Sequence, residues 1–172
     1  DTAVRQRADV LFAAVDAGDR MRVYERLRGP VLARSGNPKS GKQVFDTHCT
    51  TCHAFEGAGG QLPPRLGPDL SGIRNQPADA ILLHALVPDY EITPGYQGYV
   101  VETRDGRTLV GRLESATPNG LTLRDASQSH VILRSQVLSM AASTASLMPN
   151  ELEQAMSEQE LADLISYLKS TR

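Results

Sequence analysis

The sequence contains no tryptophan, only two cysteines and few aromatic residues, with three Phe and five Tyr among 172 residues. A hydrophobic core must therefore be built mainly from Leu, Val, Ala and Ile. No apolar run is long enough to cross a bilayer, and no signal peptide is recognisable. Because the chain begins with Asp1 rather than Met, we expect it to be a processed protein or a piece of a longer one.

The sequence also lacks an excess of one charge, since 18 Lys and Arg stand against 20 Asp and Glu. This near balance argues against nucleic acid or an anionic membrane as the main partner. Arginines are frequent in the first 36 residues, but they alternate with acidic residues, and we interpret them as a solvated helix face. These arginines are Arg5, Arg7, Arg20, Arg22, Arg26, Arg28 and Arg34.

Helical patterns occupy both ends of the chain. Apolar spacing predicts helix from residue 1 to about 28, with a break near residues 16–19 and an end at Gly29-Pro30. Residues 34–41 have the composition of a loop, and an amphipathic stretch follows over 42–48. Residues 56–77 are rich in Gly and Pro without a period, which is typical of a functional loop or one wrapped around something.

Two further helices are predicted with clear boundaries. One runs between Pro77 and Pro88, because proline starts helices well and stops them. The other begins with Ser157 and Glu160, a capping box. An apolar stripe at helical spacing follows that box, and it consists of Leu161, Leu164, Ile165 and Leu168.

Between these helices, residues 96–140 change to a period of two and contain hairpin signals. Asp105-Gly106 and Asn119-Gly120 separate short β-branched runs, which predicts four or five antiparallel strands. A flat meander would leave exposed edges, which favours a small closed barrel. The strand rhythm resembles an Sm-like or SH3-like barrel. The predicted fold class is therefore α+β, mainly α with an inserted β module.

The two cysteines lie in one short stretch, "FDTHCTTCHAFEG", as Cys49 and Cys52 followed by His53. A zinc site would need four ligands, and the remaining histidines have unsuitable spacings. A thioredoxin-like dithiol would follow a strand, and a disulfide across two residues would close too small a loop to stabilise much. The fourth interpretation is Cys-x-x-Cys-His as a covalent haem site.

The geometry of a helical turn favours haem. Cys49 and Cys52 would point to one side and form thioethers with two vinyl groups of one porphyrin, and His53 would ligate the iron. For the second axial ligand, Met148 is favoured over Met21, Met140 and Met156, because Pro149 holds it in an extended loop before the last helix. His84 is interpreted as a structural histidine, and His48 and His130 as surface residues.

The stretches "GKQVFDTHCTTCH", "GPDLSGI", "LMP" and "MSEQELADLISYL" together resemble a class I c-type cytochrome. More narrowly, the chain resembles the haem-binding domain at the C-terminus of large predicted membrane-bound dehydrogenases of planctomycetes and verrucomicrobia, in which a β segment precedes the methionine. The resemblance spans residues 37–168. It implies four parts: an N-terminal extension from an upstream domain (1–36), the first cytochrome part (37–95), the β module (96–140), and the methionine loop with the last helix (141–172).

The resemblance also implies roles for single residues. Gly41 and Phe45 would meet Leu164 and Tyr167 where the first and last cytochrome helices cross. The carbonyl of Pro68 would accept a hydrogen bond from the proximal histidine, a contact that fixes the ring. Leu70 would belong to the same pocket, and Arg74 would pair with a haem propionate.

The expected function is one-electron transfer by one haem c per chain with His and Met ligation, not an enzyme activity of the domain itself. The expected partner is a redox protein or a fused dehydrogenase. Haem attachment outside the cytoplasm implies a periplasmic or exported location. The alternative is a haem-based binder or sensor of CO, NO or O₂, with a displaceable Met148. A peroxidase-like enzyme ranks last, because no distal His and Arg pair is recognisable.

Overall fold

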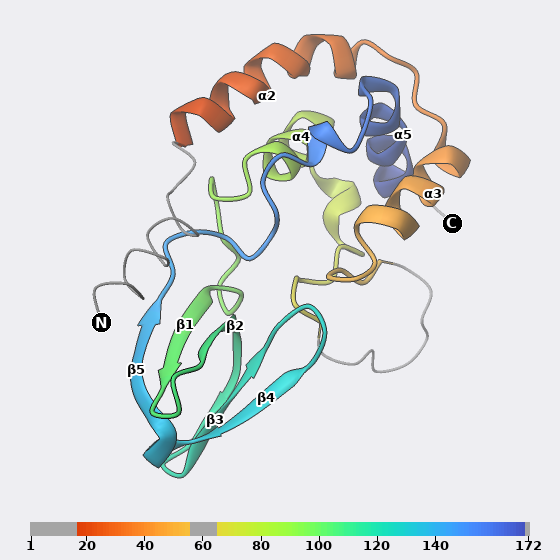
Figure 1. Ribbon diagram of the computed structural model, residues 1–172. Helices are drawn as coiled ribbons and strands as arrows, with labels where there is room; N and C mark the ends of the chain where they lie inside the picture. Colours follow the sequence, from red (N-terminus) through yellow and green to blue (C-terminus); the bar gives the residue numbers. More distant parts are fainter. Residues whose placement is uncertain (1–16, 56–64, 171–172) are drawn as a thin grey trace.

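The computed structural model describes residues 17–55 and 65–170. Two predicted features lie outside the described residues: the helix before residue 17, and residues 56–64 of the irregular stretch. Within the described residues, four α-helices form one body, and a five-stranded sheet extends from it (Figure 1). The helices are α2 (Ala17–Leu32), α3 (Pro38–His48), α4 (Ala78–Leu86) and α5 (Glu158–Lys169), with short 3₁₀ helices η1 (Ile73–Asn75), η2 (Arg134–Gln136) and η3 (Leu152–Gln154). None of the described helices has the length and apolar character needed to cross a membrane.

The centre of the helical body is the crossing of α3 and α5. Gly41 of α3 lies so close to the α5 backbone that a Cβ there would overlap the carbonyl of Asp163. The Phe45 ring lies 5.7 Å from the Tyr167 ring, centroid to centroid. The predicted crossing is therefore confirmed, and the capping box of Ser157 and Glu160 starts α5 as expected. The whole apolar stripe of α5 is buried in this core, namely Leu161, Leu164, Ile165 and Leu168.

Helix α2 packs on α4 and α5. Its predicted end was wrong, and the predicted solvated face holds for Arg22 and Arg28 but not for Arg20. The helix does not end at Gly29-Pro30 but continues to Leu32, and Val31 is buried against the helical core. Burial of Val31 offsets the lost hydrogen bond and the ring clash that Pro30 introduces inside the helix. Arg20 is not part of a solvated face, since it is 4% exposed. Its guanidinium finds hydrogen-bond acceptors inside the protein, which is what allows a charged residue to be buried.

Helix α3 starts earlier than the composition of residues 34–41 indicates. Asn37 caps the helix by accepting a hydrogen bond from the Lys39 N–H, and Pro38 follows at the first turn. Asn at the cap and Pro at the first position are a known start signal. Composition alone therefore misassigned the second half of this stretch, and the capping chemistry decides the boundary.

The sheet contains five strands, within the predicted four or five, in the order β4-β3-β2-β1-β5, and neighbouring strands are antiparallel. The strands are β1 (Gly98–Thr103), β2 (Thr108–Ala116), β3 (Gly120–Arg124), β4 (Ser129–Leu133) and β5 (Val137–Ala142). Gly106 takes φ +86° in the β1–β2 turn, a conformation that favours glycine.

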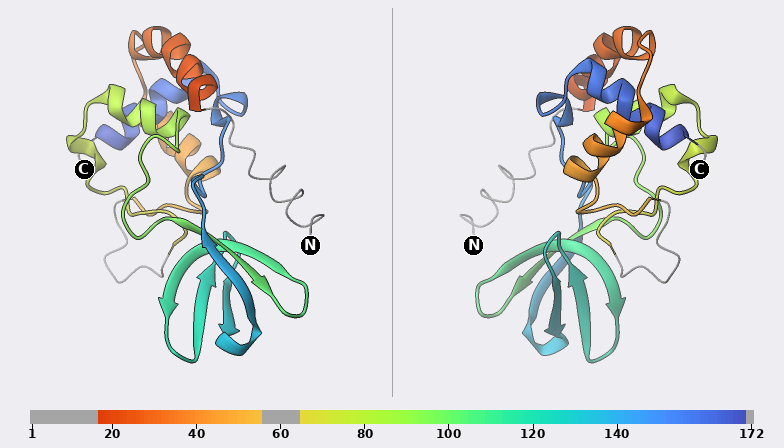
Figure 2. Two further views of the ribbon diagram at one scale, coloured as in Figure 1. Left: turned by 90° about the vertical axis from the view of Figure 1, so that its left-hand side faces the viewer. Right: turned by 90° about the vertical axis from the view of Figure 1, so that its right-hand side faces the viewer.

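The sheet is strongly curved and lies to one side of the helical body (Figure 2). Register shifts in β1 and β2 produce bends of this kind. In the described strand pairs, β1 to β4 follow one another as a meander, and β5 returns to pair with β1, which leaves β4 and β5 as the two outer strands. The sheet has a small core of its own, separate from the helical core, made of Val101, Leu121, Leu123 and Ile132.

Candidate haem site

The two cysteines lie on a helical turn that continues α3. The Cys49 N–H donates to the carbonyl of Phe45 at 2.9 Å, and the His53 N–H donates to the carbonyl of Cys49 at 2.8 Å. This turn brings Cys49, Cys52 and His53 to the wall of one cavity. Both thiols are free rather than joined in a disulfide. The structure therefore brings together the three residues of the motif as the sequence predicted.

The ring of His53 is held by the segment around Pro68. The Pro68 carbonyl oxygen accepts a hydrogen bond from Nδ1 of His53 at 2.8 Å, which is the predicted contact. The backbone supports this arrangement, since Gly67 N–H donates to the Cys52 carbonyl and Leu70 N–H to the Ala54 carbonyl, both at 2.8 Å. With Nδ1 protonated and engaged, Nε2 is left as the nitrogen that can bind a metal.

Gly67 allows this close approach. A Cβ on residue 67 would lie 2.5 Å from Cε1 of His53. No side chain fits at that distance, so only glycine permits the Pro68 carbonyl to reach the imidazole. Gly67 begins the stretch "GPDLSGI", but the sequence alone gives no sign of this steric role.

Burial changes the protonation of the site. Burial raises the pKa of the Cys49 thiol to about 11, with the neighbouring Cys52 adding to the rise. A reactive dithiol would instead need a lowered thiol pKa. Burial lowers the pKa of His53, partly opposed by the hydrogen bond to Pro68. A neutral imidazole is the form that binds a metal.

The cavity has a volume of about 420 Å³, and its wall includes Met148 as well as the Cys-x-x-Cys-His turn. Much of the remaining wall is apolar, with Leu70, Ile81 and Leu164 among its residues. A volume in this range suits a cofactor-sized ligand. Two free thiols, an oriented imidazole and a thioether around one apolar cavity fit a covalently attached haem.

Met148 is half-buried in the segment that connects β5 with η3. Its N–H donates to Oγ of Ser146 at 3.1 Å, and the Ser146 N–H donates to a carboxylate oxygen of Asp89 at 2.5 Å. Asp89 lies just beyond α4, so this segment is tied to the helical body before it reaches the methionine. Met148 lies outside the helices and strands, as expected for a residue before Pro149.

Most of the other candidates for the second iron ligand lie away from the cavity wall, with one exception. Met21 and Met156 pack in the helical core, and Met140 packs against the sheet core. The exception is His84 of α4, which also lines the cavity, with Nε2 4.0 Å from Glu91. His130 is not a simple surface residue, because its Nε2 lies 2.6 Å from a carboxylate oxygen of Asp125.

Leu70 and Arg74 differ in their relation to the cavity. Leu70 lines it, as predicted. The guanidinium of Arg74 lies 3.3–3.4 Å from the carbonyl of Ser71, and Arg74 is not part of the described cavity wall. Its pairing with a propionate stays a prediction of the resemblance.

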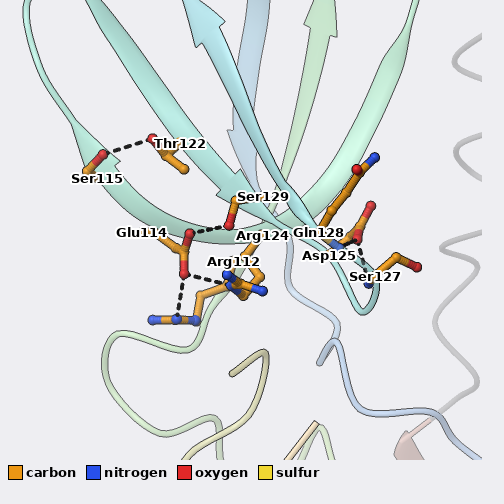
Figure 3. A network of polar contacts seen from close by, with 9 residues as sticks. All are labelled: Arg112, Glu114, Ser115, Thr122, Arg124, Asp125, Ser127, Gln128 and Ser129. Carbon is orange, nitrogen blue, oxygen red and sulfur yellow. Dashed lines mark hydrogen bonds and ion pairs between the residues drawn. The ribbon is translucent and has the colours of Figure 1, made fainter. Parts of the chain in front are cut away.

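A polar cluster that the sequence did not predict lies where the sheet meets the cavity wall. Glu114 of β2 accepts hydrogen bonds from Arg124 at 2.7 Å and from Ser129 at 2.6 Å (Figure 3). Arg112 lies opposite Arg124 in the strand register, and its guanidinium lies 5.0 Å from the centroid of the Tyr96 ring, which lines the cavity. The sequence signal for this cluster was the pair Arg112 and Glu114, two positions apart on β2, with Arg124 on β3.

Comparison with known proteins agrees with this geometry. Residues 38–108 match the family model described as Cytochrome c, a region that extends from α3 through the haem turn and α4 to the start of β2. The match supports a c-type cytochrome, and domains of this family bind covalently attached haem c and transfer electrons with it. The match and the Cys-x-x-Cys-His spacing together identify haem c as the cofactor. No curated protein matches the chain.

Proposed function

We propose that this chain transfers single electrons through a haem c that is attached to Cys49 and Cys52 and ligated by His53 and Met148. One observation carries the proposal: the motif residues and Met148, almost one hundred positions apart in the sequence, line the same cavity. When bound, haem c supplies an iron centre that changes by one electron.

With haem c bound, the residues around the cavity would have separate roles. The Pro68 carbonyl fixes the His53 ring and increases the basicity of its metal-binding nitrogen. Met148 would supply the second ligand to the iron, which would leave no site for a substrate. The apolar wall excludes water and disfavours the form with the higher positive charge, so burial and methionine ligation both raise the reduction potential.

The wider setting follows from the resemblance described above. We propose that the electron donor is a dehydrogenase, fused to this chain or separate, of the type that carries such a domain at its C-terminus. Docking would be weak and brief, as redox encounters generally are. We further propose that the sheet is an Sm- or SH3-like insertion and that the protein is exported or periplasmic, as cytochrome c domains typically are.

The first experiment is an absorption spectrum with an intact mass, on protein from cells that attach haem to cysteines. The expected mass exceeds that of the polypeptide by one haem, and the reduced protein shows the sharp bands of a low-spin c-type haem. A Cys49→Ala, Cys52→Ala double variant serves as the control and should lose the covalent mass. A colourless wild-type protein of polypeptide mass would reject the proposal.

The second experiment tests Met148 and separates electron transfer from small-ligand binding. Met148→Leu should lose the low-spin spectrum with methionine ligation, whereas the control Met156→Leu, which alters a core methionine eight positions later, should keep it. If reduced wild-type protein binds CO rapidly and stoichiometrically at neutral pH, the ligand-binding alternative holds instead. Its structural basis is that Met148 is only half-buried and lies outside any helix or strand.

A further inference from the structure

A buried ion pair joins α2 to the segment that follows Met148. Arg20 of α2 donates to both carboxylate oxygens of Glu153 in η3, at 2.8 Å from Nη1 and 2.6 Å from Nη2. The two side chains are 5% and 11% exposed. Two parallel hydrogen bonds of this kind fix direction as well as distance, which a single lysine contact would not do.

The same guanidinium also holds the end of α4. Nε and Nη2 of Arg20 donate to the carbonyl oxygen of Leu86 at 3.0 and 2.9 Å. Leu86 is the last residue of α4, where backbone carbonyls have no partner within the helix. Arg20 therefore links three segments: α2, the C-terminal end of α4, and η3.

The segment that contains Met148 is attached to the helical body on both sides of this methionine. Leu152, directly before Glu153, lines the cavity together with Met148. Before the methionine, the segment is tied to Asp89 through the Ser146 N–H. Met148 is thus placed between two attachments, one through Asp89 and one through Arg20.

The backbone between Met148 and Glu153 needs such an attachment. Glu151 has φ +69°, in the left-handed region that non-glycine residues rarely adopt. A conformation of this kind persists only where surrounding contacts enforce it. On that side, the Gln154 N–H donates to the Glu151 carbonyl oxygen at 2.9 Å, and the ion pair of Glu153 attaches this turn to α2.

We propose that Arg20 is a positioning residue for the second axial ligand: by clamping Glu153 to the end of α4, it keeps the Met148 segment closed over the haem cavity. The inference rests on the proposed ligation by Met148. It also makes α2 a working part of the haem site, although α2 precedes the region that matches cytochrome c. Loss of the clamp should leave the haem attached but allow Met148 to leave the iron more often.

The chain offers a matched control on the same helix. Arg28, two turns after Arg20, makes a bidentate ion pair with Asp79 at the start of α4, at 2.8 and 2.6 Å. This pair also joins α2 to α4, but it is more exposed and does not touch the segment after Met148. Removing it weakens the packing of α2 without removing the contact to η3.

The test compares Arg20→Gln, Glu153→Gln and Arg28→Gln as haem-loaded proteins. Three quantities are measured: the far-red methionine-to-iron charge-transfer band of the ferric form, the rate of imidazole binding to the ferric form, and hydrogen exchange of amides in residues 150–157. We expect Arg20→Gln and Glu153→Gln to weaken the band and to speed imidazole binding by on the order of tenfold or more. Exchange in residues 150–157 should also rise, while Arg28→Gln resembles the wild type.

The outcomes separate this inference from the proposed function. A wild-type protein without the charge-transfer band would reject Met148 ligation itself. If the wild type has the band and Arg20→Gln keeps the wild-type band, imidazole rate and exchange, the clamp is rejected while the ligation stands. Equal effects of Arg20→Gln and Arg28→Gln would also reject it, since general packing of α2 would then be the cause. If Arg20→Gln does not fold, Glu153→Gln decides by the same three readouts, because it leaves Arg20 bound to Leu86.

Discussion

Gly41 of α3 contacts the backbone of Asp163 in α5 so closely that a Cβ on residue 41 would overlap the Asp163 carbonyl. This contact sets the crossing of the two helices that frame the haem turn, since the cysteines follow directly after α3. Packing at this point has no spare volume, which leads to the first prediction.

Gly41→Ala should destabilise the fold by about 1–3 kcal/mol, because an inserted methyl group must push α3 away from α5. Urea titration of the variant and the wild type gives the free energies of unfolding, and their difference measures this loss of stability. Gly29→Ala is the control: a Cβ at residue 29 meets no atom within 4 Å, so that variant should be neutral or slightly stabilised. Equal stability of the two variants would contradict the close contact.

Gly67→Ala should disturb the haem site more than the fold. The added Cβ would push the His53 ring from its place and lengthen the hydrogen bond from Nδ1 to the Pro68 carbonyl. We expect a lower reduction potential or a high-spin fraction in the absorption spectrum, because the proximal ligand loses its orientation. Gly29→Ala, on α2 outside the described cavity wall and with open space around residue 29, should keep the wild-type spectrum.

Glu114→Ala should destabilise the sheet. Arg112 and Arg124 lie opposite each other on β2 and β3, and Glu114 contacts both guanidinium groups. Removing the carboxylate leaves two like charges partly buried and side by side, which should cost about 3 kcal/mol. Thermal unfolding measures the loss. Ser115→Ala, the next residue on the same strand with an exposed hydroxyl contact, should have little effect.

The β3–β4 turn should be sensitive to acid. A hydrogen bond from His130, followed by those from the Gln128 and Ser127 amides, lowers the pKa of Asp125 from 3.8 to about 2. Because the folded pKa lies below the unfolded value, the stabilisation is complete above about pH 5 and is lost as the pH falls from 4 towards 2. It should amount to at most about 1 kcal/mol, since the pair is partly exposed to solvent.

Unfolding free energies measured between pH 6 and 2 test this prediction. Asp125→Asn should show a smaller loss of stability over that range than the wild type. Ser127→Ala, which keeps the backbone N–H that contacts Asp125, should retain the wild-type dependence. Identical curves for Asp125→Asn and the wild type would show that another group causes the acid sensitivity.

Local sequence signals were sufficient where a few neighbouring residues determine the structure. The Cys-x-x-Cys-His turn, the capping box of α5 and the Asp-Gly and Asn-Gly hairpins were predicted because each depends on contacts within a few positions. Residue types impose the backbone geometry of such short-range features directly. These features could therefore be predicted without knowledge of the rest of the chain. Their boundaries were less certain, as the early start of α3 at Pro38 shows.

The sequence by itself thus determined the haem motif, the helices and hairpins, and the choice of Met148 as the candidate ligand. Only the tertiary structure decided that Arg20 is buried against Glu153 and Leu86, that α2 packs with the helical core, and that Met148 lines the same cavity as His53. The physical reason is that an arginine on a helix has the same local pattern whether it faces water or a distant carboxylate. Its burial depends on a partner 133 positions away, and only the folded chain brings the two together.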